Sequence, residues 1–203
     1  MAGDSAWRCR RLDAASRSKL DEFARLVTLV PLAEIPASPI EALLDAAFGA
    51  DRHRRTAYRL REGTQPIAEL SFAAMGEARG ADPAPLLGTV QSWPVVLEHA
   101  GGRYPLVLVG PVAVLPTAQR RGIGRMLTAA VVAAAERGGR PPLTLIGDPD
   151  YYGRFGFSAA GTGGWALPGP FERHRLLLRP AADADVPDHG TLRAAMPALR
   201  PVA

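Results

Sequence analysis

The segment from Gly110 to Arg125 restricts the fold of this chain of 203 residues more than any other part of it. It begins inside an almost entirely apolar run, residues 104–115, which is typical of a strand covered on both faces. After a short turn, apolar residues at spacings of three and four predict a helix over residues 121–137. Gly122 and Gly124 stand where this helix begins. Together with the strands and helices predicted around it, the segment indicates a single α/β or α+β domain.

The glycines at this helix start favour the binding of a phosphate group. A helix N-terminus exposes about four unpaired backbone N–H groups and carries roughly half a positive charge. Because Gly122 and Gly124 have no Cβ, a bulky anion can approach these amides closely. Arg120, Arg121 and Arg125 add formal positive charge beside them. The segment therefore predicts a pyrophosphate site.

Three nucleotide-binding patterns compete for this site. The P-loop requires Gly-Lys-Ser/Thr, which is absent, and the dinucleotide fingerprint requires a third glycine where Leu127 stands. The remaining pattern, Gln119-Arg-Arg-Gly122-Ile-Gly124 after an apolar strand, resembles the acetyl-CoA signature of GNAT acetyltransferases. The alternative is that the glycines only permit close packing of helix and strand. The resemblance extends over roughly Leu32 to Arg179.

This resemblance implies a GNAT fold, in which helices flank one mixed, mostly antiparallel central sheet with a bulged, splayed strand. Pro111 agrees with it, since a proline in an otherwise central strand is found at a bulge or an edge. By resemblance, the pantetheine arm lies in the gap beside this strand and pairs with its backbone like an added strand. The residues expected to bind acetyl-CoA are Val112, Ala113, Val114, Gln119, Arg120, Arg121, Gly122, Ile123, Gly124 and Arg125.

A second segment, residues 147–157, is expected to carry the catalytic acid. Asp148 is a good N-cap and Pro149 a good first helical residue, so a short helix is predicted here. A Tyr-x-x-x-Gly-Phe sequence occupies this place in GNAT enzymes, and its tyrosine, here Tyr152, protonates the departing CoA thiolate. The transfer runs from a phenol of pKa about 10 to a thiolate whose acid has a pKa of about 8.5. Packing is the alternative for Tyr152, and packing or a substrate-pocket role is expected for Tyr151.

The implied mechanism is direct attack of a neutral amine on the thioester while both substrates are bound. Glu69, on a predicted strand, is a possible base, with Asp148 and a water chain as alternatives; Glu69 could instead be solvated or paired. Residues 51–61 occupy the region where GNAT proteins form part of the acceptor pocket. Their arginines favour an acceptor with a carboxylate or phosphate, or they form a solvated helix face. No cluster of metal ligands is present, so no metal is expected.

The chain is divided into an N-terminal extension (1–25), helical or disordered, an acetyltransferase domain (26–180) and a peripheral tail (181–203). Within the domain, Pro31 should confine a first strand, residues 26–32, to an edge of the sheet or shorten it. Helices are predicted from about residue 36 to Gly49 and from 52 to 60. Further strands are predicted over 70–75, 87–97 and 143–146, near residue 157, and over 173–179.

Composition limits the partners and the compartment. A single cysteine, Cys9, rules out an internal disulfide, and no apolar run reaches the roughly 18 residues that cross a membrane. The net charge of +4 comes from scattered arginines, without a helix-turn-helix pair, zinc spacing or basic stripe, so nucleic acid is not an expected partner. We expect a cytoplasmic acetyl-CoA-dependent N-acetyltransferase that acts on a primary amine of a small molecule or peptide, with a homodimer possible. The alternative is a non-catalytic acyl-CoA sensor or scaffold of the same fold.

Overall fold

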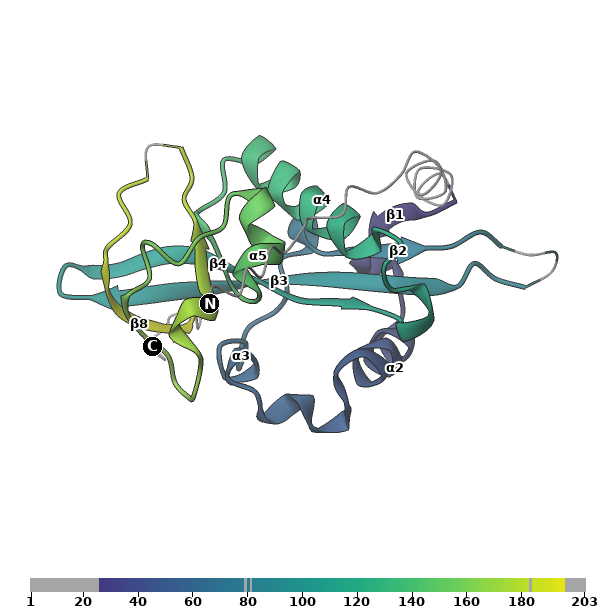
Figure 1. The fold of residues 1–203 in the computed structure, drawn as a ribbon, viewed down its shortest axis with the longest axis horizontal. Helices are drawn as coiled ribbons and strands as arrows, with labels where there is room; N and C mark the ends of the chain where they lie inside the picture. Colours follow the sequence, from purple (N-terminus) through teal and green to yellow (C-terminus); the bar gives the residue numbers. More distant parts are fainter. Residues whose placement is uncertain (1–25, 79, 81, 183, 196–203) are drawn as a thin grey trace, which may run out of the picture.

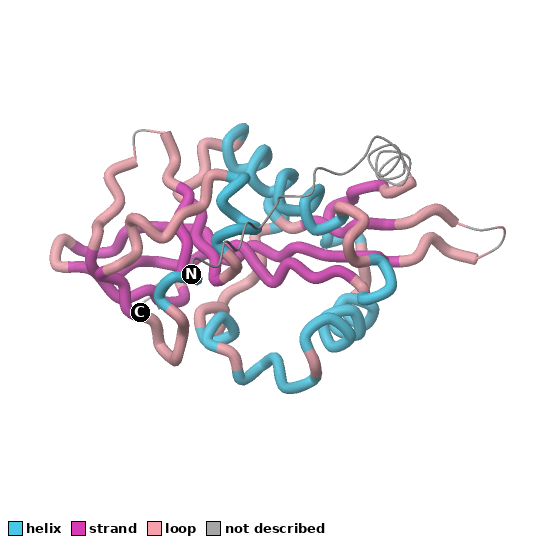
Figure 2. Tube along the Cα trace, viewed as in Figure 1, coloured by secondary structure: helices cyan, strands magenta, loops and turns pink. Residues whose placement is uncertain are grey.

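The computed structural model describes residues 26–78, 80, 82–182 and 184–195, so the predicted N-terminal extension lies outside the described residues. Helices cover both faces of one central sheet: α4 (Ile123–Arg137) lies on one face, and α2 (Ala37–Phe48) and α3 (Thr56–Arg59) lie on the other (Figure 1). Figure 2 shows the same layers, with the strands running between the two groups of helices. No helix within the described ranges is long and apolar enough to cross a membrane.

The described residues form a sheet of eight strands. This sheet is mixed and mostly antiparallel, as predicted. Its main path runs in the order β1-β2-β3-β4-β5-β7; β8 pairs with β3 and with β6. All pairs are antiparallel except β4 with β5 and β6 with β8. The strands are β1 (Thr28–Pro31), β2 (Phe72–Met75), β3 (Leu86–His99), β4 (Gly102–Val114), β5 (Leu143–Ile146), β6 (Gly164–Ala166), β7 (Leu176–Arg179) and β8 (His189–Ala194). Among the described strands β1 pairs only with β2, so it lies at an edge, one of the two outcomes expected from Pro31.

The apolar residues of α2 and α4 recur at the spacing of a helix with one buried face. α4 buries Ile123, Leu127 and Val131 against the sheet, and α2 buries its own apolar stripe on the opposite face. Gly49 ends α2 with a φ of 85°, in the left-handed region that glycine adopts without a steric penalty. The short helices are η1 (Leu32–Glu34), η2 (Ala50–Arg54), η3 (Ala68–Leu70), η4 (Pro116–Ala118), α5 (Pro149–Tyr152), η5 (Gly153–Phe155) and η6 (Arg173–Arg175).

Three predicted elements differ from the structure. The helix expected over residues 52–60 is divided into η2 and α3, because Arg55 between them is extended with a ψ of 145°. Near Phe157 there is only an isolated bridge between Ser158 and Leu178. Residues 189–194 of the expected peripheral tail form β8, which pairs with β3 and buries Leu192 completely.

The predicted bulge lies in β4 and opens the sheet beside it. Val90 of β3 pairs with Val112, but Ser92 pairs with Val109, so β4 has one extra residue in this interval. The parallel pairing of β4 with β5 is limited to the stretch before the bulge, at Val107 and Leu108. Beyond it, β5 stays paired with β7 while β4 continues alongside β3. The two parallel strands therefore separate where Pro111 stands.

Candidate functional site

The turn before α4 directs the first amides of this helix toward solvent. Arg120 has a φ of 63° and Gly122 a φ of 85°, so two residues of the turn are left-handed. The amide of Met126 donates to Gly122 O at 3.0 Å, which begins the helical hydrogen bonding. The N–H groups of the preceding three residues, 123–125, therefore lie at the open end of the helix. This is the arrangement predicted for anion binding.

A cavity of about 730 Å³ surrounds this helix end. It is lined by Val114, Ala118, all of residues 119–126, Ala129, Tyr151 and Phe155. Every residue predicted at the signature, from Gln119 to Arg125, lines it, and no Asp or Glu does so among the described residues. The cavity therefore combines three arginines with the positive end of the helix dipole, which suits a diphosphate.

A second cavity, of about 800 Å³, lies at the β4 bulge. One wall is formed by residues 108–112 of β4 and residues 146–148 at the end of β5. Tyr151 and Tyr152 of α5 line the cavity as well, and Tyr151 also lines the first cavity. The two cavities thus adjoin at Tyr151. Of the predicted β4 residues, Val112 lines the second cavity and Val114 the first, whereas the side chain of Ala113 is buried on the other face of the sheet.

α5 holds the two tyrosines in place. Asp148 caps the helix, since its Oδ1 accepts a hydrogen bond from Asp150 N at 3.0 Å. The ring of Tyr152 packs directly against the backbone of Gly147, where a Cβ would collide with it. Burial raises the pKa of the Tyr152 hydroxyl well above its ordinary value, and burial also raises that of Tyr151. Both phenols therefore stay protonated at neutral pH.

Another part of the second cavity's lining comes from residues 48–61. For residues 51–61 the sequence left two interpretations open, a role in the acceptor pocket and a solvated helix face. The solvated face is wrong for Arg52 and Arg61, whose exposed fractions are 2% and 8%. Arg52 forms ion pairs with Glu41 and Asp45 of α2, the latter at 2.7 Å. Arg52 and Arg61 are therefore buried side chains that line the cavity at the bulge.

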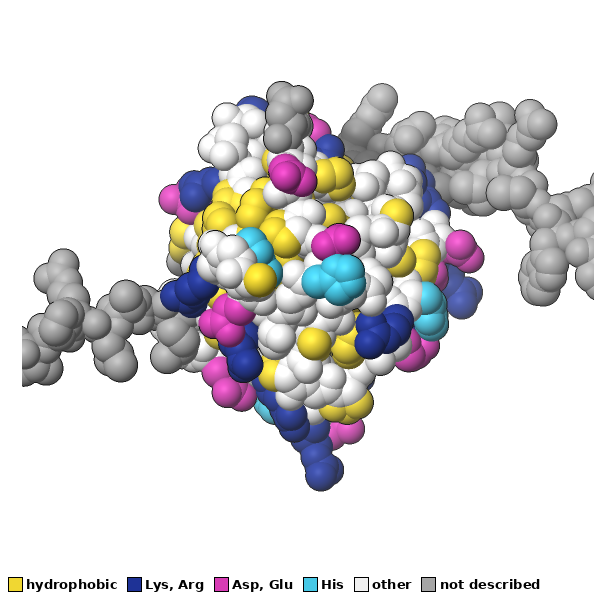
Figure 3. Space-filling model, turned by 90° about the vertical axis from the view of Figure 1, so that its left-hand side faces the viewer, with side chains coloured by type: hydrophobic (Ala, Val, Ile, Leu, Met, Phe, Trp, Pro, Cys, Tyr) yellow, Lys and Arg dark blue, Asp and Glu magenta, His cyan; other side chains and the backbone are white. Residues whose placement is uncertain are grey.

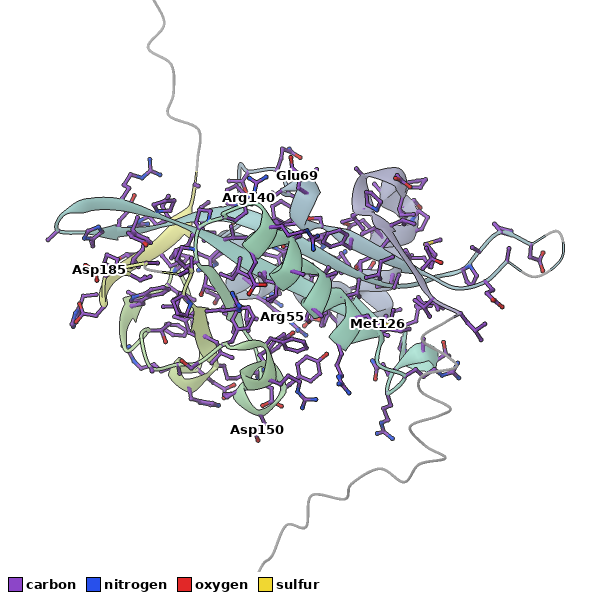
Figure 4. The ribbon with its side chains drawn as sticks, turned by 90° about the horizontal axis from the view of Figure 1, so that it is seen from above. Arg55, Glu69, Met126, Arg140, Asp150 and Asp185 are labelled. Atoms are coloured by element: carbon purple, nitrogen blue, oxygen red, sulfur yellow. The ribbon has the colours of Figure 1, made fainter. Side chains whose placement is uncertain are left out.

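Glu69 is not brought to the site, which corrects the expectation that it could be the base. It lies in η3 rather than in a strand, and its side chain is 68% exposed. It forms an ion pair with Arg140 at 3.6 Å, next to the C-terminal end of α4, whereas Met126 marks the opposite end, where the first cavity lies (Figure 4). Glu69 lines neither cavity.

Several residues of the second cavity were missed at the sequence level. Phe171, Glu172 and Arg175 line it, and they come from a segment about 60 residues after the β4 bulge. No local pattern distinguishes them, because only the chain's return to β7 brings them to this wall. Asp148 and Glu172 are the carboxylates that line the cavity among the described residues. In the same part of the chain, no group of three or more His, Cys, Asp and Glu could hold a metal.

Known proteins share both the sequence pattern and the fold. The acetyltransferase (GNAT) domain family matches residues 34–160. No curated protein matches the sequence. A GNAT family N-acetyltransferase from Escherichia coli, solved in complex with CoA, aligns with a TM-score of 0.63 and 24% identity, over 83% of this chain and 88% of that one. A GNAT family acetyltransferase from Brucella melitensis, solved in complex with acetyl-CoA, aligns with a TM-score of 0.52 and 24% identity, over 82% and 94% of the two chains.

Proposed function

Because this chain belongs to the GNAT acetyltransferase family, we propose that it is an acetyl-CoA-dependent N-acetyltransferase whose acceptor is a primary amine of a small molecule or peptide. One observation carries the proposal. The cavity at the start of α4 adjoins a second cavity at the β4 bulge, and a protonated tyrosine lines that second cavity. With the diphosphate of acetyl-CoA in the first cavity and an amine in the second, the thioester and the amine would meet along the β4–β5 gap.

The residues at the start of α4 fit the diphosphate of acetyl-CoA. Gly124 forms part of this cradle, since a Cβ there would lie 2.8 Å from Tyr151 Oη and would fill the space between helix and tyrosine. We propose that the amides of residues 123–125 and the arginines of the turn hold the phosphates. The backbone of residues 112–114 would pair with the pantetheine arm. Bound in this way, acetyl-CoA supplies the thioester that the amine attacks.

Tyr152 is proposed as the general acid. Tyr152 lines the cavity at the bulge, and burial keeps its hydroxyl protonated, so this hydroxyl would donate its proton to the leaving thiolate sulfur. The ring cannot swing toward Gly147, because the backbone there already contacts it. Its orientation is therefore set by packing before any substrate binds, which favours proton donation at one fixed point.

Asp148 is proposed to accept the amine proton, directly or through water. The other carboxylate of the cavity, Glu172, lies 3.6 Å from Arg175 Nη1 and 3.5 Å from His174 Nε2, which hold it within its own segment. Asp148 also accepts a backbone hydrogen bond as the cap of α5. Asp148→Asn keeps the cap but not the basicity, so it should lower kcat without lowering the melting temperature. Unchanged kcat would exclude Asp148 as the base.

Thermal melting with acetyl-CoA tests the binding half of the proposal. At a ligand concentration a hundredfold above Kd, binding stabilises a protein by about 2.7 kcal/mol. For a chain of this size we expect the melting temperature to rise by roughly 5–10 °C. CoA should act similarly, whereas NAD and ATP serve as controls. No shift with acetyl-CoA at millimolar concentration would contradict the proposed site.

Release of CoA thiol tests the transfer half. With acetyl-CoA present, a panel of primary amines should increase thiol release, and mass spectrometry should find one acetyl group on the amine. A thermal shift without thiol release from any amine would instead favour a non-catalytic acyl-CoA-binding protein.

A further inference from the structure

Four arginines line the cavity at the β4 bulge, but only two of them have acidic partners. Arg52 is paired with Glu41 and Asp45, and Arg175 is paired with Glu172. The other two, Arg55 and Arg61, form no ion pair with any described residue. Among the described residues that line this cavity, the four arginines outnumber the two carboxylates, Asp148 and Glu172.

Arg61 is the more unusual of the two because it is buried. Its Nε donates to Ala57 O at 3.1 Å, and its Nη1 donates to Gln91 Oε1 at 3.4 Å. Its guanidinium carbon lies 3.6 Å from the centroid of the Tyr58 ring and 5.3 Å from that of Trp93. Burial lowers the pKa of this guanidinium. These hydrogen-bond partners are neutral, and burying a cation without a directly bonded anion is costly. An anion that entered the cavity would offset part of this cost.

The surroundings hold Arg61 in a fixed position. Arg52 donates a hydrogen bond to Tyr58 Oη, and Glu41 and Asp45 of α2 neutralise Arg52. Tyr58 is thereby fixed beneath the Arg61 guanidinium. A long side chain that is ordered in advance loses little conformational entropy when it binds a ligand. This network has the properties of a binding site that exists before its ligand arrives.

Arg55 reaches the same cavity from the turn between η2 and α3. Its Nη2 donates to Phe48 O at 3.0 Å, and its guanidinium carbon lies 5.4 Å from the centroid of the Phe48 ring. Unlike Arg61 it is exposed, so it stands at the mouth of the cavity rather than inside it. The two guanidinium groups thus line the same cavity at different depths.

We propose that the acceptor amine carries an anionic group, a carboxylate or a phosphate, which Arg61 binds with help from Arg55. This inference rests on the proposed acetyltransferase function. Guanidinium groups suit both anions because their planar forks match the oxygen atoms in pairs. The phosphates of acetyl-CoA have the separate cavity at α4, which neither arginine lines. Nearby positive charge also favours the neutral form of the acceptor amine, which is the nucleophile.

Matched pairs of acceptors test the inference. Thiol release would be measured with β-alanine against β-alaninamide and with phosphoethanolamine against ethanolamine. Further amines would be added to the panel as matched pairs of one anionic and one neutral compound. The wild type should favour the anionic member by about 10- to 100-fold in kcat/KM, the size expected for hydrogen bonds to a charged group. The pair with the larger ratio of kcat/KM between its anionic and its neutral member identifies the anion as carboxylate or phosphate.

Arg61→Gln should remove most of this preference by lowering kcat/KM for the anionic acceptor alone, with KM for acetyl-CoA unchanged. Arg54→Gln is the control, because Arg54 is exposed in the same segment and does not line the cavity. If Arg61→Gln does not fold, the exposed Arg55→Gln should reduce the same preference. Equal turnover of neutral and anionic acceptors, an equal loss on both, or weaker acetyl-CoA binding in Arg61→Gln would overturn the inference. No thiol release with any amine would count against the proposed function instead.

Discussion

Tyr151 and Tyr152 are neighbours in sequence but differ in their surroundings. The Tyr151 hydroxyl lies against the first turn of α4, on the border of both cavities, and its ring is 4.8 Å from that of Tyr152 between centroids. Tyr152 packs instead on Gly147 and toward Phe157, with a centroid distance of 6.1 Å to the latter. α5 thus places Tyr151 against the start of α4 and Tyr152 against the end of β5.

Replacing Tyr152 by Phe removes the hydroxyl and keeps the packing. We expect kcat to fall by about 100-fold or more, as for the loss of a general acid, while the thermal shift with acetyl-CoA stays the same. Tyr151→Phe is the matched control and should retain most of the turnover. If Tyr152→Phe turned over at the wild-type rate, Tyr152 would have only a packing role.

The raised pKa of Tyr152 also determines the pH profile. An ordinary tyrosine ionises near pH 10, but burial favours the neutral form of Tyr152, so its proton is retained above that pH. We expect kcat to increase with pH as the acceptor amine loses its proton, and then to stay level up to about pH 10. A decrease that begins near pH 8 would show that the essential acid is another group. The melting temperature measured across the same range separates this effect from unfolding.

At the scale of elements, the start of α4 combines a tight turn with a close contact. The turn needs left-handed backbone at Arg120 and Gly122, and α5 then brings Tyr151 against Gly124. Neither feature stabilises the helix itself, since glycine is less favourable than alanine in a helix. We infer that the left-handed turn and the missing Cβ at Gly124 keep the amides of the first turn accessible to a ligand.

Gly124→Ala should separate stability from cofactor binding. The added methyl would lie 2.8 Å from Tyr151 Oη and would narrow the cradle, so we expect a smaller thermal shift with acetyl-CoA while α4 still forms. Adding Tyr151→Phe removes the atom that the methyl meets and should restore part of the shift. Gly153→Ala is the control, because nothing lies within 4 Å of a Cβ there. An undiminished shift in Gly124→Ala would place the cofactor elsewhere.

At the scale of the whole molecule, the C-terminal strand completes the sheet. β8 pairs with the far half of β3, and Trp165 Nε1 donates to Pro187 O at 2.9 Å just before β8 begins. Figure 3 looks onto this end of the molecule, where acidic and basic side chains are mixed with apolar ones. We therefore propose that the folded acetyltransferase domain extends beyond residue 180 to include β8.

Leu192→Ala tests this extension. Leu192 is completely buried in the cluster around Trp165 and Leu97. Its truncation should lower the free energy of unfolding by about 2–5 kcal/mol, measured by urea denaturation, without changing the Kd for acetyl-CoA. Arg193→Ala is the control: its side chain is 55% exposed and paired with Glu98 at 2.6 Å, so its loss should cost about 1 kcal/mol or less. Equal, small losses in both variants would mean that β8 is peripheral.

The sequence by itself determined those features that depend on neighbouring residues. Apolar spacing predicted α2, α4 and the long central strands; the glycines at 122 and 124 predicted where α4 begins, and Pro111 predicted the bulge. Each of these follows from local sterics, hydrogen bonding or the burial of one face, so the residues that cause it stand next to one another in the chain.

Only the tertiary structure decided how distant segments meet. Glu69 lies away from both cavities, because η3 packs near the C-terminal end of α4 rather than at its start. The tertiary structure also brought residues 48–61 and 170–175 together over the bulge and buried Arg61 there, although nothing in the local sequence separates Arg61 from its exposed neighbours Arg54 and Arg59. Local patterns describe one element at a time, whereas burial and charge pairing depend on which elements pack together.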